Sequence, residues 1–251
     1  MKTLVSFVFH EYNNRVENFF KNCIFQDAEV DFLVICNNKH IQLPPLPEYV
    51  KIIKRDNHGF DFGGWSEGIL TNKLYKNYER FIFANSSIIG PFLPADFKGK
   101  WTDIYINGLS TNNVKLFGST INNMIFINVD PSKINITTVN PMACSHVQSY
   151  IFSMDIETLE FLINTEIFSL DNTAKTFNNA ILNKEVRMSR SIIENGWNIG
   201  CTHQLYKNVD FTFKTKFPFE YGITFLGDIM YPQYANIFWK PQELVFIKGN
   251  R

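Results

Sequence analysis

One stretch of the chain concentrates side chains that could bind a nucleotide. It holds a cation, two carboxylates and three glycines in the order Arg55-Asp56-Asn57-His58-Gly59-Phe60-Asp61-Phe62-Gly63-Gly64-Trp65. Arg55 offers a forked donor for phosphate, and the carboxylates of Asp56 and Asp61 could accept from ribose hydroxyls or a base. Gly63 and Gly64 would let phosphate approach the backbone ahead of a helix. The same composition also fits a capped surface turn.

Two further segments place polar side chains beside apolar runs. In Ala84-Asn85-Ser86-Ser87-Ile88, an apolar strand ends in three small polar residues. Such an end faces the ligand crevice of a parallel sheet, although Asn and Ser also begin turns for local reasons. In Ser145-His146-Val147-Gln148-Ser149-Tyr150, polar residues alternate with apolar ones. His146 could contact phosphate, an acceptor or a metal, or it could be a hydrogen-bonded structural histidine.

A fourth segment carries a carboxylate in a helical context. Its sequence is Asn183-Lys184-Glu185-Val186-Arg187-Met188-Ser189, in which Glu185 and Arg187 flank an apolar stripe. A lone Glu on a helix is usually a solvated surface residue, so the residue types alone do not make Glu185 catalytic.

The first part of the chain alternates strands and helices, which predicts a parallel sheet. Apolar runs predict strands over residues 4–9, 30–36, 50–54 and 80–84, with helices beginning near Val16 and Trp65. We expect residues 1–95 to form the nucleotide-binding half of a single domain that spans residues 1–251. Residues 96–251 would form the acceptor-binding half and a C-terminal wrap.

The second half has a different pattern. From Asp103 to Asn128, short strands with little helix predict an antiparallel portion of a mixed sheet, including Lys115 to Gly118 and Met124 to Asn128. A long helix with Leu182, Val186 and Ile193 on one face should end at Asn195-Gly196. The aromatic tail from Tyr221 onward should wrap the surface as ordered loop.

Composition excludes several classes of function. Lys plus Arg and Asp plus Glu each number 24, so no net positive field exists to bind nucleic acid. The cysteines Cys23, Cys36, Cys144 and Cys201 form no CxxC pair, which favours reduced buried thiols over a zinc site. No signal peptide and no run of about 18 apolar residues is present, so we expect a cytoplasmic protein without a transmembrane segment.

In this order, the four segments resemble the rhamnan-synthesis family of glycosyltransferases, found in bacterial cell-wall polysaccharide clusters and in large DNA viruses. The closing segment from Pro241 to Arg251 is also similar. The resemblance implies a GT-A fold, with a Rossmann-like mixed α/β sheet flanked by helices in one domain. It implies transfer from a UDP- or dTDP-sugar to a glycan hydroxyl, in the host cytoplasm if the protein is viral.

The resemblance also assigns roles to residues. Gln148 and Trp197 would bind the acceptor. The donor would be bound by Phe9, His10, Arg55, Asp56, Asp61, Gly63, Gly64, Asn85, Ser86, Ser87, Lys248 and Arg251.

Glu185 would be the base of an inverting reaction, with His146 a second catalytic candidate. Asn85-Ser86-Ser87 stands where related enzymes carry an Asp-x-Asp metal motif, but it has no carboxylate. Asn85 and Ser87 would be only weak ligands for Mn²⁺ or Mg²⁺. Lys248, Arg251 or His146 could neutralise the leaving diphosphate instead. No organic cofactor is expected.

Three alternatives compete with this interpretation. A nicotinamide-dependent enzyme needs a Gly-rich turn after its first strand, where this chain has Phe9-His10-Glu11-Tyr12-Asn13. A glycoside hydrolase needs paired carboxylates, and none stands out. A catalytically inactive glycan- or nucleotide-binding module stays open, because it could retain the pocket without the metal motif. Measured catalytic turnover would distinguish an enzyme from such a module.

Overall fold

The protein is a single α/β domain, seen in a computed structural model that describes residues 1–123, 145–214, 228–230 and 238–249. Seven strands form one mixed sheet in the order β10-β6-β9-β4-β1-β2-β3. Their bounds are β1 Thr3–Phe9, β2 Val30–Cys36, β3 Val50–Lys54, β4 Arg80–Asn85, β6 Val114–Gly118, β9 Ile151–Asp155 and β10 Asn198–Cys201. The predicted mixed sheet flanked by helices is confirmed.

Strand direction divides this sheet. β1 pairs in parallel with β2 and β4, and β2 pairs in parallel with β3. β9 lies antiparallel between β4 and β6, and β10 is parallel to β6. The carboxyl ends of all strands except β9 therefore meet at one edge, the position where open α/β sheets bind ligands.

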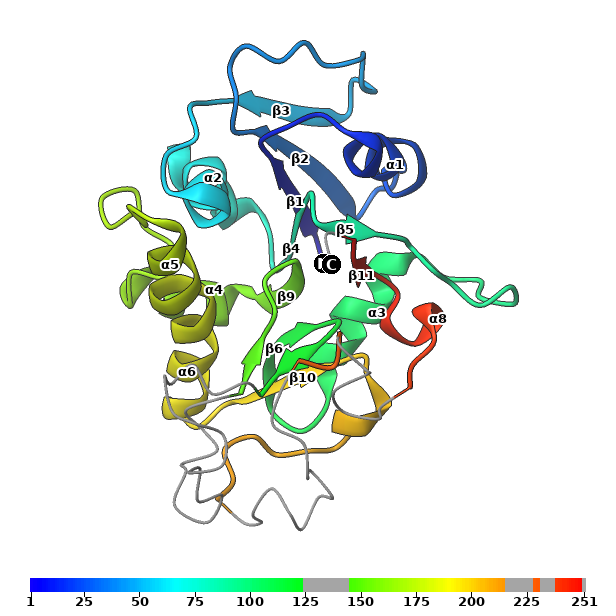
Figure 1. Cartoon of the computed structure of the whole chain (residues 1–251), viewed down its shortest axis with the longest axis vertical. Coiled ribbons are helices and arrows are strands. Elements are labelled where there is room, and N and C mark those ends of the chain that lie inside the picture. Colours follow the sequence, from blue (N-terminus) through cyan, green and yellow to red (C-terminus); the bar gives the residue numbers. More distant parts are fainter. Residues whose placement is uncertain (124–144, 215–227, 231–237, 250–251) are drawn as a thin grey trace.

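Helices cover both faces of the sheet (Figure 1). The α-helices are α1 Asn14–Asn22, α2 Phe60–Leu70, α3 Trp101–Asn107, α4 Ile156–Asn164, α5 Phe177–Asn179, α6 Arg187–Glu194 and α8 Pro241–Leu244. Between α5 and α6 lies a π-helical turn, η5, Ala180–Val186. Short 3₁₀ helices are η1 Thr71–Asn77, η2 Gly108–Ser110 and η6 Gln204–Tyr206.

Two apolar cores hold these layers together. On one face, Trp65 of α2 packs against Phe83 and Phe152 of the sheet, within a core that extends to α4 and α6. On the other face, Phe7 stacks on Phe19 of α1, within a core that includes α3. Alternate residues of β1 face opposite cores, as the period of a strand requires.

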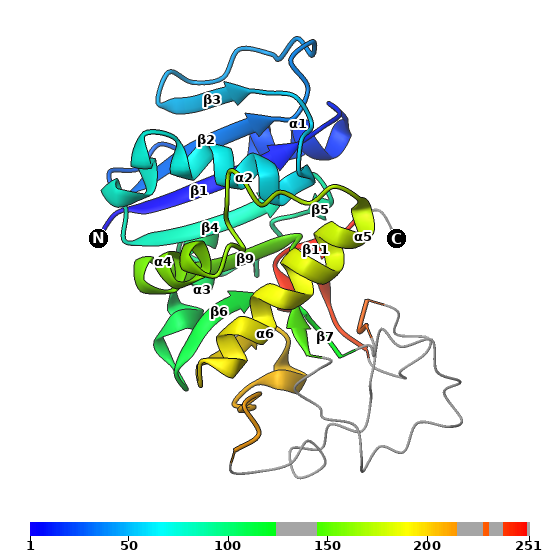
Figure 2. The ribbon, with the colours of Figure 1, turned by 90° about the vertical axis from the view of Figure 1, so that its left-hand side faces the viewer.

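Two small two-stranded sheets complete the fold. β5 Ile88–Ile89 pairs antiparallel with β11 Ile247–Lys248, and β7 Ile121–Asn122 pairs antiparallel with β8 His146–Val147. Figure 2 shows β5, β11 and α5 gathered at the end of the main sheet that lies opposite the N-terminus. The C-terminal segment thus returns to the carboxyl edge.

Several local predictions were wrong. Residues 103–107 belong to helix α3, because Trp101, Tyr105 and Ile106 bury one side of a helical turn. Leu182 is exposed, because the π-helical turn η5 interrupts the regular period of the helix. The tail is more than loop, since it contributes α8 and β11. Residues 124–128 lie outside the described part.

The structure also bears on the expectations about transmembrane segments and cysteines. Within the described residues, no helix has the length and apolar character needed to cross a membrane. Cys23, Cys36 and Cys201 are buried free thiols, and burial raises the pKa of each of them. Cys144 lies outside the described residues.

Candidate functional site at the carboxyl edge

Four distant segments bring polar side chains together where the parallel strands end. We call Asp61, Asn85, Glu185 and Lys248 the carboxyl-edge cluster. Asn85, the last residue of β4, donates from Nδ2 to Asp61 Oδ2 at 2.9 Å. Its Oδ1 accepts from the Ser87 backbone N–H at 2.9 Å. Asn85 therefore joins the start of α2 to the turn that follows β4.

The surroundings of the Asp61 carboxyl group shift its pKa. Burial and, to a smaller extent, the negative charge of Glu185 raise the pKa of Asp61 to about 6. The Asn85 hydrogen bond and the positive charge of Lys248 act in the opposite direction. Asp61 and Glu185 are far apart in the chain, so the electrostatic effect of Glu185 on Asp61 could not be predicted from the sequence.

Glu185 is held in place by the backbone of another segment. Its Oε1 accepts from the Ser149 backbone N–H at 2.8 Å. The preceding residue, Lys184, is buried and donates to the backbone oxygens of Glu166 and Asn172, each at 2.6 Å. Glu185 therefore sits on a turn anchored on one side by Lys184 and on the other by Ser149. π-Helical turns are frequent at functional sites.

Arg55 is committed to contacts inside the chain. Its Nε donates to Glu67 Oε2, its Nη1 to Asn37 Oδ1 and its Nη2 to the His58 backbone oxygen, each at 2.7 Å. The side chain is buried. These bonds hold the loop that leads into α2. All three guanidinium nitrogens already have partners within the chain, which argues against the phosphate contact that we expected.

Gly63 and Gly64 also differ from expectation, because α2 begins at Phe60 and both glycines lie inside the helix. A Cβ on Gly64 would approach Val8 Cγ2 to 2.8 Å, and one on Gly63 would approach the His58 oxygen to 2.1 Å. Both glycines are buried. Their small size serves close packing of α2 against β1 and its own entry loop, not a phosphate contact.

The segment around His146 is an interior network. Gln148 is buried, donates to Asp228 Oδ2 at 3.1 Å and accepts from Thr120 Oγ1 at 2.6 Å. His146, in β8, is buried as well. Both side chains are therefore interior, and neither is placed at a surface open to an acceptor.

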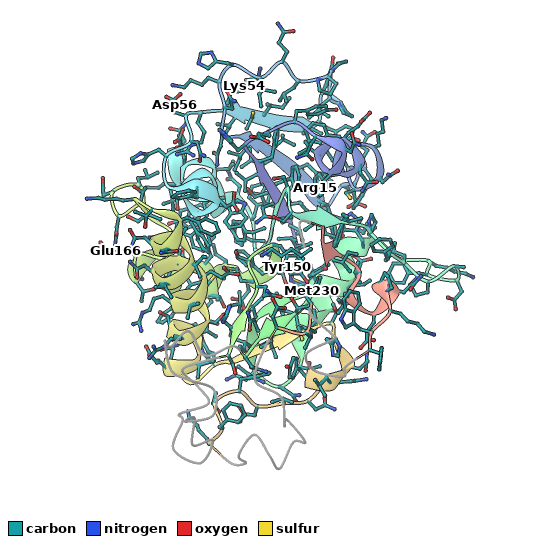
Figure 3. All side chains as sticks on the ribbon, in the orientation of Figure 1. Arg15, Lys54, Asp56, Tyr150, Glu166 and Met230 are labelled. Carbon is teal, nitrogen blue, oxygen red and sulfur yellow. The ribbon has the colours of Figure 1, made fainter. Side chains whose placement is uncertain are left out.

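The remaining expected residues have separate locations. Phe9 is buried in the core around α1. His10 is exposed, with Nδ1 at 2.8 Å from the Asn37 backbone oxygen. Asp56 is exposed and paired with Lys39, and Figure 3 shows it at the outer margin, far from Tyr150.

Trp197 precedes β10 at the opposite edge of the sheet, where it packs on Phe161. The structure therefore does not bring Trp197 to the cluster. Arg251 lies outside the described residues.

Two features of the site escaped the sequence analysis. Arg15, near the start of α1, donates from Nε to the Ser86 backbone oxygen at 2.8 Å. Phe177 of α5 is 67% exposed and packs edge-on against Phe60, whose φ of 56° is unusual for a bulky residue. Neither residue belonged to a recognisable motif, and only the fold brings them near the cluster.

The residues at the turn after β4 do not fit a divalent cation. The Asn85 side-chain oxygen already accepts from Ser87, and two cations, Arg15 and Lys248, border the same turn. Among the described residues, no group of three or more His, Cys, Asp or Glu side chains is arranged to hold a metal ion. Hard cations need several oxygen ligands, which this turn does not offer.

The fold and the cluster define an α/β protein with a polar site at the carboxyl edge of its sheet. Comparison with family models assigns it further: the model described as Rhamnan synthesis protein F matches residues 32–232, which is most of the chain. The chain belongs to this family, which indicates a role in polysaccharide synthesis. No curated protein matches the sequence.

Proposed function

We propose that the chain is a glycosyltransferase of the GT-A type that moves a sugar from a UDP- or dTDP-sugar to a hydroxyl of a glycan acceptor. The observation that carries this proposal is the convergence of Asp61, Asn85 and Glu185 at the carboxyl edge of the sheet. Membership of a rhamnan-synthesis family supports a biosynthetic reaction on sugars.

Glu185 is the base in this proposal. One of its oxygens is oriented by the Ser149 N–H, and the carboxylate accepts the proton of the acceptor hydroxyl. The oxygen of the acceptor hydroxyl forms the new bond to the anomeric carbon while the bond between that carbon and the diphosphate oxygen breaks. The bonding electrons leave with the diphosphate, and attack from the opposite face inverts the anomeric configuration.

The pair formed by Asp61 and Asn85 holds the donor sugar. Above pH of about 6, the Asp61 carboxylate is ionised and accepts hydrogen bonds from sugar hydroxyls, while Asn85 fixes its orientation. Such positioning lowers the barrier by aligning the anomeric carbon with the attacking oxygen.

Phe177 and Phe60 supply an exposed aromatic surface beside this cluster, since Phe60 directly precedes Asp61 and α5 runs into η5. An apolar ring face suits the C–H face of an acceptor sugar. The acceptor side of the site therefore lies at α5.

The direct test is a panel of UDP- and dTDP-sugars incubated with bacterial-type polysaccharide fragments. We expect one donor to release its nucleoside diphosphate together with an elongated glycan, and the product anomer, assigned by NMR, to be inverted. Binding of a nucleotide sugar without any turnover would favour the binding-module alternative. Cleavage of the glycan without a nucleotide would favour a hydrolase built on the paired carboxylates.

A further inference from the structure

Two cationic side chains border the turn after β4, at the position where the resemblance implies metal ligands. Its three residues, Asn85, Ser86 and Ser87, contain no carboxylate. The backbone N–H groups of Ser86 and Ser87 are already used, by the Val8 oxygen and the Asn85 side chain. A ligand at this turn would therefore be bound by side chains, namely the Ser86 and Ser87 hydroxyls and the neighbouring cations, and not by these two N–H groups.

Arg15 is one of these neighbours. It lies at the start of α1, and its Nε donates to the Ser86 oxygen. This bond fixes the guanidinium beside the turn. Its Nη1 and Nη2 form no hydrogen bond or ion pair with the described residues. A guanidinium anchored at Nε presents its two terminal nitrogens in the geometry that matches phosphate oxygens.

Lys248 is the second neighbour. It pairs with Ile88 in the sheet formed by β5 and β11, and the next residue, Gly249, donates from its backbone N–H to the Ser87 oxygen at 2.6 Å. The positive charge of Lys248 lowers the pKa of Asp61, so its ammonium lies within electrostatic reach of that carboxyl group. It forms no salt bridge within the described part of the chain.

The C-terminal segment also contacts Arg15 directly. A Cβ on Gly249 would lie 3.1 Å from Arg15 Cδ, so the stem of Arg15 passes directly against the residue after Lys248. The two positive charges offset those of the neighbouring Asp61 and Glu185 carboxylates and give an anion at the turn two cationic partners. A diphosphate has enough oxygens to accept hydrogen bonds from both cations.

We propose that Arg15 and Lys248 bind the diphosphate of the donor directly, so that the chain binds donor and nucleoside diphosphate without a divalent cation. This inference rests on the proposed function for the identity of its ligand. The two cations stabilise the negative charge that develops on the leaving diphosphate, which is the part a metal ion plays elsewhere.

The test uses inorganic pyrophosphate, which has no base or sugar, and isothermal titration calorimetry on the full chain after EDTA treatment. We expect binding in EDTA with a Kd within about 3-fold of that measured with Mg²⁺ or Mn²⁺. Arg15→Gln and Lys248→Gln should each weaken binding about 10- to 100-fold, the usual effect of losing a charge-assisted hydrogen bond. Gln at position 15 keeps a donor for the Ser86 oxygen.

Matched controls separate this effect from general loss of charge. Lys21→Gln, on the same helix as Arg15, and Arg190→Gln, on α6, remove cations that pair with Glu17 and Glu194 on the surface. Both should bind pyrophosphate as the unaltered chain does. Thermal unfolding followed by circular dichroism verifies that each variant is folded.

The outcomes distinguish this inference from the proposed function. Binding that requires Mg²⁺ or Mn²⁺, or folded Arg15 and Lys248 variants that bind like the controls, would overturn the inference even if sugar transfer occurs. Metal-free binding that depends on both cations supports it even if no transferase activity is found.

Discussion

Asp61→Asn should stabilise the fold at neutral pH, because it removes a carboxylate whose ionised form the site disfavours. Burial, assisted by the charge of Glu185, raises the pKa of Asp61 from 3.8 to about 6. This increase of about 2 pKa units corresponds to a free-energy cost of about 3 kcal/mol for ionising Asp61 in the folded state. Asp61 keeps some solvent contact, so we expect a gain of about 1–3 kcal/mol. Asn can still accept the hydrogen bond from Asn85.

The stabilisation by Asp61→Asn should increase with pH. Below pH 3.8 Asp61 is protonated in both the folded and unfolded states, so its ionisation costs no stability there. The cost grows as pH rises from about 4 and is complete above about 6, because the folded state holds its proton longer. At pH 4.5 the gain from Asp61→Asn should be about a third of its value at pH 7.5.

The assay is urea unfolding at pH 4.5 and pH 7.5, followed by tryptophan fluorescence. Asp56→Asn is the matched control, because the hydrogen bond and charge of Lys39 lower the pKa of Asp56, so its removal should give no stabilisation at pH 7.5. An Asp61→Asn chain that is no more stable than the original at pH 7.5, or equally stabilised at both pH values, would refute this account of Asp61.

Three other substitutions test the supports of the site. Lys184→Met should lower the free energy of unfolding by about 1–3 kcal/mol in urea titrations, since it leaves the Glu166 and Asn172 oxygens without their buried donor. Gly64→Ala should cost about 1–3 kcal/mol in the same assay, because its Cβ would press on Val8. Phe177→Ala should change stability by less than about 0.5 kcal/mol and raise the acceptor KM about 2- to 10-fold in steady-state kinetics. Stability unchanged for either buried substitution, or an unchanged acceptor KM, would contradict the assigned contacts.

The regular part of the fold could be predicted from the sequence. Strands β1, β2 and β4 are mainly apolar, as strands of a sheet buried on both faces require, whereas the edge strand β3 is largely exposed. All four were predicted within a residue or two of their bounds. Helix α3 was missed because only seven residues form it, too few for a clear helical period. The π-helical turn was missed because its period differs from that of an α-helix.

The candidate site could be predicted only in part. Residue types and order drew attention to Asp61, Asn85 and Glu185, but their contact depends on how β4, α2 and η5 pack. Composition also suggested that Arg55 binds phosphate, whereas three internal partners occupy its guanidinium. A charged residue in a motif can bind a ligand or hold the loop, and only its contacts distinguish the two.

The central claim is that Glu185 is the base of a sugar transfer, and the most direct test is the rate of transfer by Glu185→Gln once the donor is known. Gln keeps an oxygen for the Ser149 N–H but cannot take the acceptor proton. We predict that kcat falls by about 100-fold or more while nucleotide binding stays unchanged. A Glu185→Gln chain that transfers sugar at a near-normal rate would contradict the assignment of Glu185.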